Sequence, residues 1–211
     1  YSEVPAAASG MFTKNKVKGA PISISKDHLS NKKAQAIIVN SGNANTCNGT
    51  DGLNKAKKMT CLQAKELNLK ADDILVASTG VIGVPLNIDA IKSGIPLLTQ
   101  KLSKEGHDDA SSAIMTTDTV KKELALEFTI GDKVVTIGAM AKGSGMIEPN
   151  MGTMLSFITT DIAIIPELLD EALKSCVKVT YNRVSVDGDT STNDSVFILA
   201  NGLAENNLIS E

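Results

Sequence analysis

Residues 124–137 read LALEFTIGDKVVTI, and this stretch decides the fold class. Two apolar and β-branched runs, 124–130 and 133–137, flank the dipeptide Gly131-Asp132. Two turn residues between two such runs are typical of a tight β-hairpin. The chain therefore contains antiparallel strands, which argues against a doubly wound sheet made only of parallel strands.

On both sides of this hairpin, short apolar runs alternate with segments whose apolar residues recur at helical spacing. Strands are expected at 34–40, 74–77, 154–158 and 196–200, and helices at 53–67, at 88–102 with an interruption at Gly94 and Pro96, and from Pro166 onward. In the last helix, Leu169, Leu173, Cys176 and Val177 fall on one face. Strands and helices mixed in this way predict an α/β or α+β domain built in layers.

Composition excludes several classes of protein. The 211 residues carry a net charge of −3, with 42% hydrophobic and 21% charged residues, which is an ordinary globular mixture. No apolar run is long enough to cross a bilayer, so no membrane partner is expected. With no Trp and no basic patch, nucleic acid is not an expected partner. Three cysteines without metal-ligand spacing, and no apolar leader, favour a reduced, cytoplasmic protein.

Histidine chemistry is not favoured. The chain has two histidines, His28 and His107, each in a polar stretch, and both are expected at the surface. A catalytic triad needs a buried imidazole, and a zinc site needs clustered His and Cys ligands. Neither pattern is present, so we expect no metal and no histidine-activated nucleophile.

Two glycine-rich segments resemble ligand loops but depart from their patterns. Residues 138–145, GAMAKGSG, lack the Lys-Ser/Thr pair of a phosphate loop, and Glu148 stands where a dinucleotide fingerprint has its third glycine. In VDGDTSTND, Asp187, Asp189 and Ser191 match the start of a calcium loop, but Thr192 replaces the required glycine. A turn is the better interpretation of this second segment.

Hydroxyl side chains beside glycine turns remain as candidates: Thr79, Thr116, Thr117, Ser144 and Thr153. A hydroxyl nucleophile without histidine needs another base, and a threonine made N-terminal by cleavage supplies its own α-amine. The pKa of an α-amine is about 7.7–8.0, against about 10.4 for lysine, so a useful fraction is neutral at pH 7. Composition alone does not say which threonine this would be.

Residues 142–155, KGSGMIEPNMGTML, closely resemble the self-cleavage motif of the ornithine acetyltransferase family, the glutamate N-acetyltransferases of arginine biosynthesis. Five further stretches match the family in the same order: AAASGMFTKNKVKGAP at 6–21, IVNSGNAN at 38–45, ASTGVIG at 77–83, AIMTTDT at 113–119 and DGDTSTND at 187–194. Any one would be weak, but six in order across nearly the whole chain are highly specific.

The resemblance implies a cleavage site and three catalytic residues. The precursor would cleave itself between Gly152 and Thr153, although members commonly have alanine where this chain has Gly152. Thr153 would then be the nucleophile of a ping-pong cycle. Thr79 and Gly80 match the family's oxyanion-hole pair, which would stabilise the negative oxygen formed in each step.

The resemblance also implies how substrates bind. Thr116, Lys142 and Thr153 itself match substrate-binding positions, and the Lys142 ammonium would hold a carboxylate. Acetyl would move from N2-acetyl-ornithine to glutamate without a cofactor. Some members also accept acetyl-CoA, which makes it a candidate substrate here.

The family has an α-β-β-α sandwich fold and assembles from two copies of each cleaved chain, a heterotetramer of two α and two β chains. By this resemblance residues 1–152 correspond to the α-chain, and residues 153–211 to the start of the β-chain. Members are considerably longer, and the C-terminal half has no counterpart here. We therefore expect a fragment with unpaired strand edges, for example beside 196–200. Two alternatives stay open: an aminopeptidase-like hydrolase on the same scaffold, and an inactive fragment.

Overall fold

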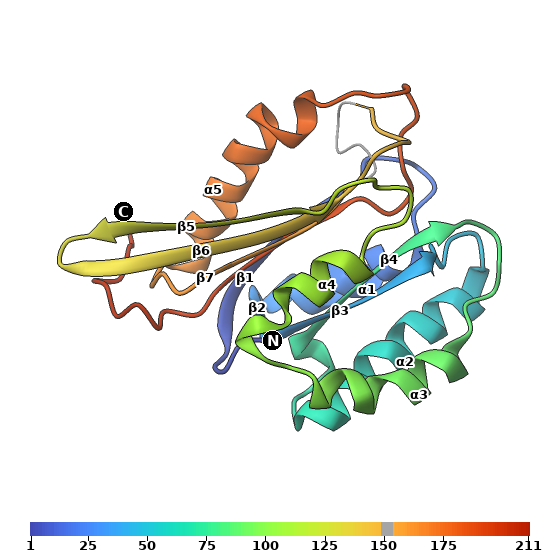
Figure 1. The fold of residues 1–211 in the computed structure, drawn as a ribbon, viewed down its shortest axis with the longest axis horizontal. Helices are drawn as coiled ribbons and strands as arrows, with labels where there is room; N and C mark the ends of the chain where they lie inside the picture. Colours follow the sequence, from blue (N-terminus) through green and yellow to red (C-terminus); the bar gives the residue numbers. More distant parts are fainter. Residues whose placement is uncertain (149–153) are drawn as a thin grey trace.

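Two sheets of unequal size lie in the middle of the molecule (Figure 1). The computed structural model describes residues 1–148 and 154–211. The larger sheet has the order β2 (Lys33–Ala34), β1 (Ala6–Phe12), β8 (Ser195–Ala200), β7 (Leu155–Thr160), β6 (Lys133–Lys142) and β5 (Lys122–Ile130). The smaller sheet pairs β3 (Ala36–Asn43) with β4 (Ile74–Val81) in parallel. In the larger sheet β7 and β8 are parallel and the other pairs are antiparallel.

Helices cover the outer faces of both sheets (Figure 1). The helices are α1 (Ala20–His28), α2 (Gly49–Leu67), α3 (Ile88–Gln100), α4 (His107–Ala113) and α5 (Pro166–Val179), with 3₁₀ turns at Leu29–Asn31, Ala71–Asp73, Lys104–Gly106 and Tyr181–Arg183. Helix α5 packs on β1 of the larger sheet, and α1 and α2 pack on β4. The order of layers is therefore helix, sheet, sheet, helices, which confirms the expected α-β-β-α sandwich.

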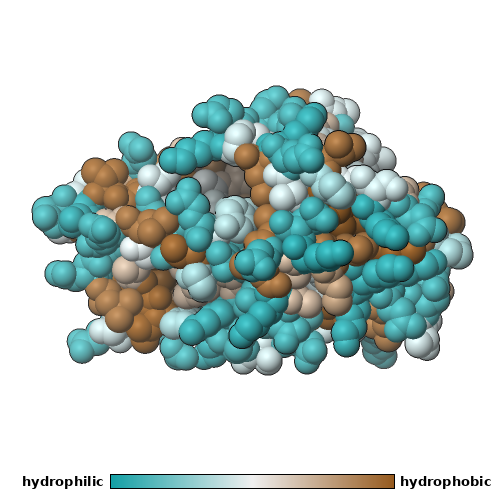
Figure 2. All heavy atoms as spheres, turned by 90° about the horizontal axis from the view of Figure 1, so that it is seen from below, coloured by the Kyte–Doolittle hydropathy of each residue, from teal (hydrophilic) through white to brown (hydrophobic). Residues whose placement is uncertain are grey.

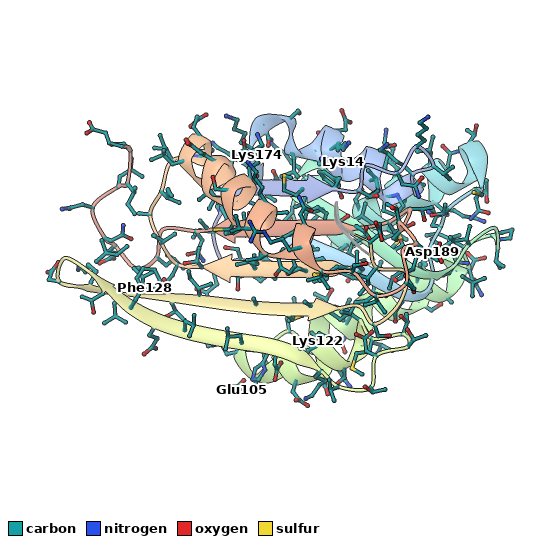
Figure 3. The ribbon with its side chains drawn as sticks, turned by 90° about the horizontal axis from the view of Figure 1, so that it is seen from above. Lys14, Glu105, Lys122, Phe128, Lys174 and Asp189 are labelled. Carbon is teal, nitrogen blue, oxygen red and sulfur yellow. The ribbon has the colours of Figure 1, made fainter. Side chains whose placement is uncertain are left out.

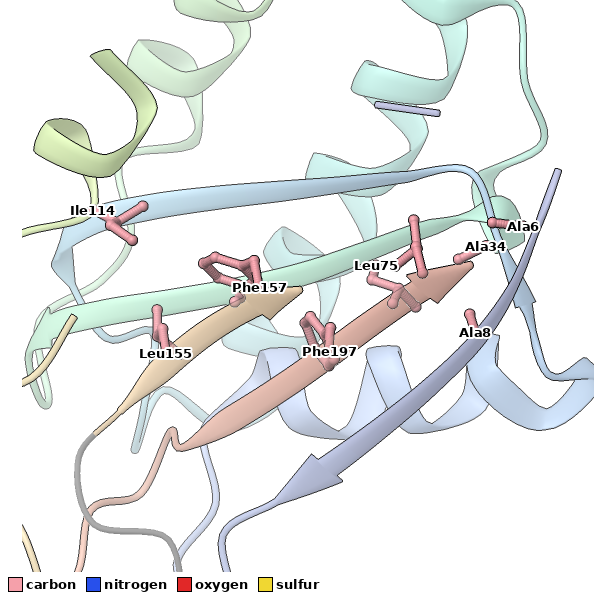
Figure 4. Packing of buried hydrophobic residues seen from close by; sticks show 10 residues of the cluster. Ala6, Ala8, Ala34, Leu75, Ile114, Leu155, Phe157 and Phe197 are labelled. Atoms are coloured by element: carbon pink, nitrogen blue, oxygen red, sulfur yellow. The ribbon is translucent and has the colours of Figure 1, made fainter. Parts of the chain in front are cut away.

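The main core lies between the two sheets (Figure 4). Leu75 and Ala77 of β4 belong to the same buried cluster as Leu155, Phe157 and Phe197 of β7 and β8. A second cluster fills the space between β3–β4 and the helices α2 and α3. Because β4 supplies residues to both clusters, its first four residues, ILVA, are all apolar rather than alternating with polar ones.

The β5–β6 hairpin confirms the prediction from residues 124–137. Its register runs from Lys122 opposite Ala141 to Ile130 opposite Lys133, and Gly131 takes a positive φ of 62° in the turn. The hairpin extends away from the body of the molecule, so Leu124, Leu126 and Phe128 are exposed. Apolar atoms gather at the same end of the molecule in Figure 2.

Two expectations about helices were wrong. Helix α3 runs unbroken from Ile88 to Gln100 with Pro96 inside it. Proline removes the N–H that would reach the carbonyl of Lys92, and Lys92 lies on the exposed side, where water can serve that carbonyl. On α5, Leu169, Leu173 and Val177 are buried, but Cys176 is exposed because the contact face is narrower than the sequence suggested.

The expected strand edge at 196–200 was also wrong. Strand β8 lies between β1 and β7, with hydrogen-bonded neighbours on both sides. Its partner β1 and the helix α1 were not expected from sequence. Strand β1 reads AAASGMF, which has no β-branched residues, and α1 reads APISISKDH, in which β-branched isoleucines obscure the helical signal.

Candidate functional site

The end of β4 carries Thr79 and Gly80, which lie beside Ser41 and Gly42 of β3. Thr79 is buried, and Gly80 has a φ of +131°. A Cβ atom built on Gly80 would lie 2.2 Å from the carbonyl carbon of Gly42. Both the backbone conformation and the close approach of β3 therefore require glycine at this position.

Lys142 and Thr116, distant in sequence, lie in direct contact. Lys142 is the last residue of β6, its exposed fraction is 3%, and its Nζ donates a hydrogen bond to Thr116 Oγ1 at 3.0 Å. Burial lowers the pKa of Lys142, and the charges of Asp118 and Asp194 oppose that shift. The site thus contains a buried cation whose charge depends on nearby carboxylates.

Asp118 supports this pair and was missed in the sequence. Its carboxylate accepts hydrogen bonds from Lys122 Nζ at 2.7 Å, the N–H of Gly143 at 2.8 Å and the N–H of Thr116 at 3.4 Å. Desolvation disfavours its ionised form, but the hydrogen bonds outweigh it and hold the pKa of Asp118 below its ordinary value. Nothing in the local pattern distinguishes Asp118 from a surface aspartate, because the contact with the Gly143 N–H, directly after β6, forms only in the folded chain.

Two more of the candidate hydroxyls meet in the same region. Thr117 Oγ1 and Ser144 Oγ are 2.8 Å apart, which links the loop before β5 to the loop after β6. Lys122 marks this end of β5 in Figure 3, and Phe128 lies toward the opposite end of the hairpin. The residues around Lys142 therefore gather at one end of the larger sheet.

Gly152 and Thr153 lie outside the described residues. The first described residue after them is Met154, whose N–H donates to Asp194 Oδ1 at 3.0 Å. The Met154 carbonyl accepts the N–H of Ser195 at 3.0 Å. Across the sheet, Lys142 pairs with Leu155 and Leu155 pairs with Ser195, so the Lys142 backbone is two strands away from the start of β8.

Asn193 connects this end of the larger sheet to β4. Its Nδ2 donates to the carbonyls of Ser78 at 2.9 Å and Ala44 at 2.6 Å. Its Oδ1 accepts the hydroxyls of Thr46 and Thr192, each at 2.6 Å. The buried side-chain amide of Asn193 thus fixes the end of β4, which carries Thr79 and Gly80, relative to the loop that leads into β8.

The loop at 187–194 is organised by backbone hydrogen bonds. Asp187 accepts the N–H groups of Met146 at 2.6 Å, Ile147 at 2.9 Å and Asp189 at 3.3 Å. The N–H of Met146 is the largest of the effects that lower the pKa of Asp187. The bond to Asp189 is the local turn expected of this sequence. Within the described residues no group of three His, Cys, Asp or Glu side chains is arranged to hold a metal ion.

Both histidines were expected at the surface, which is confirmed for His107 and wrong for His28. His107 is exposed and bonds to Glu123 at 3.3 Å, as expected of a surface residue. His28 is buried, with its Nδ1 2.7 Å from the carbonyl oxygen of Ile74 and its Nε2 3.6 Å from Asp72. Its position at the end of α1 turns it toward β4, and no local polar pattern reveals that.

Similarity to known proteins covers the whole chain. The ArgJ family matches residues 1–211. The chain is 54% identical over 210 residues to "arginine biosynthesis bifunctional protein ArgJ 1" of Clostridium acetobutylicum, and 50% identical over 211 residues to the ArgJ protein of Caldanaerobacter subterraneus. The alignments cover 100% of this chain but 52% of each relative, so the chain spans about half their length.

Two solved structures resemble this one. The ArgJ protein of Bacillus halodurans gives a TM-score of 0.65 at 40% identity, covering 72% of this chain and 79% of that one. The ornithine acetyltransferase of Mycobacterium tuberculosis, solved with ornithine, gives 0.62 at 31% identity, covering 73% and 80%. Among the described residues no helix is long and apolar enough to span a membrane.

Proposed function

This chain belongs to the ArgJ family, and on that premise we propose that it forms part of an acetyltransferase that moves acetyl from N2-acetyl-ornithine to glutamate. The observation that carries the proposal is the hydrogen bond from the buried ammonium of Lys142 to the exposed Thr116, at the sheet end where β7 begins. A buried ammonium next to a hydroxyl suits the carboxylate of an amino-acid substrate. Met154 lies at the same sheet end, and Thr153, the proposed nucleophile, is the residue before it in the sequence.

In the proposed maturation, the Thr153 hydroxyl attacks the carbonyl carbon of Gly152. The C–O bond forms, the C–N bond breaks, and the released α-amine of Thr153 takes up the proton. Water then hydrolyses the ester, which leaves a carboxylate on Gly152 and restores the hydroxyl. Residues 1–152 and 153–211 are thereby separated, and Thr153 gains an α-amine able to act as a base.

In the proposed acetyl transfer, the Thr153 hydroxyl attacks the acetyl carbonyl of N2-acetyl-ornithine while the α-amine accepts its proton. The amide C–N bond breaks, and ornithine leaves with that proton. The amine of glutamate then attacks the acetyl ester, forms N-acetylglutamate and returns a proton to the hydroxyl. Both steps create an oxyanion, for which Thr79 and Gly80 are the proposed donors.

The remaining parts of the proposal follow from the family. No cofactor is needed, and acetyl-CoA is a candidate alternative donor of acetyl to Thr153. The assembly is proposed to contain two copies of each cleaved chain, and its location to be cytoplasmic. A hydrolase would use water in place of glutamate, so release of ornithine with and without glutamate distinguishes the two reactions.

The test uses a protein extended to the length of the relatives, because this chain covers half of them. We expect Thr153→Ala to remain uncleaved and to transfer no acetyl, because it has no nucleophile. Thr129→Ala, an exposed threonine on β5, is the matched control and should behave as wild type. Mass spectrometry of the chains and an N2-acetyl-ornithine assay give the two measurements. Cleavage at the same bond in Thr153→Ala would refute self-cleavage.

A further inference from the structure

Asp194 is a buried carboxyl group at the start of β8, with an exposed fraction of 1%. Its Oδ1 accepts the N–H of Met154 at 3.0 Å, and its backbone carbonyl accepts the N–H of Thr13 at 3.0 Å. The preceding residue, Asn193, is held by four hydrogen bonds of its side chain. The backbone that carries this carboxyl group is therefore held by several hydrogen bonds, and the carboxyl group in turn binds the N–H of Met154, the residue after Thr153.

The second oxygen of this carboxyl group has no structural explanation. Oδ2 is buried and makes no hydrogen bond within the described parts of the chain. Burial raises the pKa of Asp194 to about 7, against the opposing effects of the Met154 N–H, the Ser191 side chain and the charge of Lys142. The charges of Lys142 and Asp194 act on each other across the end of the sheet, although the two side chains form no ion pair in the described structure. A buried carboxylate oxygen without a hydrogen bond in the described structure costs stability, and such groups are typical of functional sites.

The same loop also holds the other side of the segment that contains Gly152 and Thr153. Asp187 accepts the N–H groups of Met146 and Ile147, before the segment, while Asp194 accepts that of Met154, after it. Asp187 and Asp194 are the first and last residues of DGDTSTND. One short loop thus anchors both flanks with carboxylates.

Resting on the proposed function, we propose that Asp194 is a positioning residue for both reactions of Thr153. Its hydrogen bond to the Met154 N–H fixes the peptide on which Thr153 is carried, and its negative charge stabilises the ammonium form of Lys142.

Two variants separate these contributions. Asp194→Asn keeps a side-chain oxygen that can accept the Met154 N–H but removes the charge. Asp194→Ala removes both. Asp170→Asn is the matched control, because Asp170 lies on α5 and bonds to Ser9 and Lys174. Figure 3 places Lys174 on α5, away from the loop that contains Asp189.

The measurements are the rate of cleavage by mass spectrometry and kcat and KM for N2-acetyl-ornithine across the neutral pH range, in a protein of the relatives' length. Losing a charge-assisted hydrogen bond typically changes a rate or affinity by about 10- to 100-fold. We expect Asp194→Ala to slow cleavage at least about 10-fold. We expect Asp194→Asn to cleave within about threefold of wild type but to raise KM about 10-fold.

The pH profile gives a readout that a purely structural role would not change. In wild type, kcat/KM should fall as the pH drops through about 7, because protonation removes the charge of Asp194. In Asp194→Asn the part of this fall that comes from Asp194 should be absent, which leaves the limb set by the Thr153 α-amine alone. The alkaline limb should also move to lower pH, because Lys142 has lost a charge that raises its pKa.

The inference is overturned if Asp194→Ala cleaves at the wild-type rate, if Asp194→Asn keeps the wild-type KM and pH profile, or if both variants fail to fold. In those cases acetyl transfer by the wild-type protein still supports the proposed function. A wild-type protein that neither cleaves nor transfers acetyl would overturn the proposed function and this inference together.

Discussion

At the scale of single residues, the candidate site combines buried charges with backbone positions that other residues cannot occupy. Lys142, Asp118 and Asp194 are each removed from water, and each depends on a specific partner for its ionisation state. Removing one partner of such a set leaves an uncompensated buried group, which is more costly than losing a surface ion pair. Substitutions here should therefore have large and specific effects.

In a protein of the relatives' length that has the proposed activity, Lys142→Met should weaken substrate binding more than it slows chemistry. The apolar side chain has a similar length but cannot hold a carboxylate, so we expect KM for N2-acetyl-ornithine to rise about 10- to 100-fold with a smaller change in kcat. Lys142→Arg should restore binding only in part, because the planar guanidinium group of arginine differs in shape and reach from the compact ammonium group of lysine. Lys174→Met on α5 is the control. Unchanged KM values for both ornithine and glutamate substrates would exclude Lys142 from binding.

Gly80→Ala should destabilise the fold through both strain and overlap. The positive φ of 131° and the 2.2 Å approach to Gly42 act together, so we expect a loss of at least about 2 kcal/mol in the free energy of unfolding. Gly83→Ala is the matched control, because Gly83 has a φ of 80° but an added Cβ atom would meet nothing within 4 Å. Chemical denaturation compares the two, and equal losses would show that the close approach of β3 does not matter.

At the scale of elements, two local features do not have their usual effect: a proline does not end helix α3, and apolar side chains on β5 are not buried. Helix α3 continues through Pro96, and the β5–β6 hairpin exposes the apolar side chains of Leu124 and Leu126. Tertiary packing decides in the first case, because Ile95 is buried against the cluster that includes Met59 and Ile38. A helix anchored in this way keeps its geometry even where one backbone hydrogen bond is missing.

Gly94→Ala should stabilise the protein by about 0.5–1 kcal/mol. Gly94 lies inside the continuous helix α3, and a Cβ atom there meets nothing within 4 Å. Alanine therefore lowers the backbone entropy of the unfolded chain without causing a clash in the folded one. Gly131→Ala, at the positive φ of the hairpin turn, should instead destabilise it. Thermal unfolding measures both. A loss of stability in Gly94→Ala would mean that the helix is broken at this position.

At the scale of the whole molecule, the two sheets are joined by apolar packing and by one buried amide. Leu75 and Phe157 pack between the sheets, while Asn193 connects the carbonyls of Ser78 and Ala44 to the loop before β8. Apolar packing alone tolerates small shifts of one layer over the other, whereas directed hydrogen bonds set a single alignment. The distance between the β4 end and Met154 thus depends on Asn193.

Asn193→Asp should destabilise the protein by about 3 kcal/mol at neutral pH. The change replaces the donor nitrogen with an oxygen that faces two carbonyls, and it places an unpaired charge in a buried position. Asn207→Asp, at an exposed position, is the control and should be nearly neutral. Urea denaturation gives the comparison. A similar small effect in both variants would show that Asn193 does not join the layers.

Sequence patterns alone were enough to predict the hairpin, several further strands and helices, and the membership of the family. Gly131-Asp132 between apolar runs predicted the hairpin, and six ordered motifs indicated the family that matches residues 1–211. These signals are short in range, because turn chemistry and motif spacing need no knowledge of distant partners.

Contacts between polar residues that are distant in sequence could be identified only in the folded chain. Thr116 and Lys142 were identified as candidates by their resemblance to family positions. Asp118, Asn193 and Asp194 were not, because their hydrogen-bond partners lie far away in the sequence. The burial of His28 against Ile74 and the central place of β8 were missed for the same reason. Burial and pairing across a sheet depend on which strands become neighbours, and that arrangement is set by packing of the whole chain rather than by any local pattern.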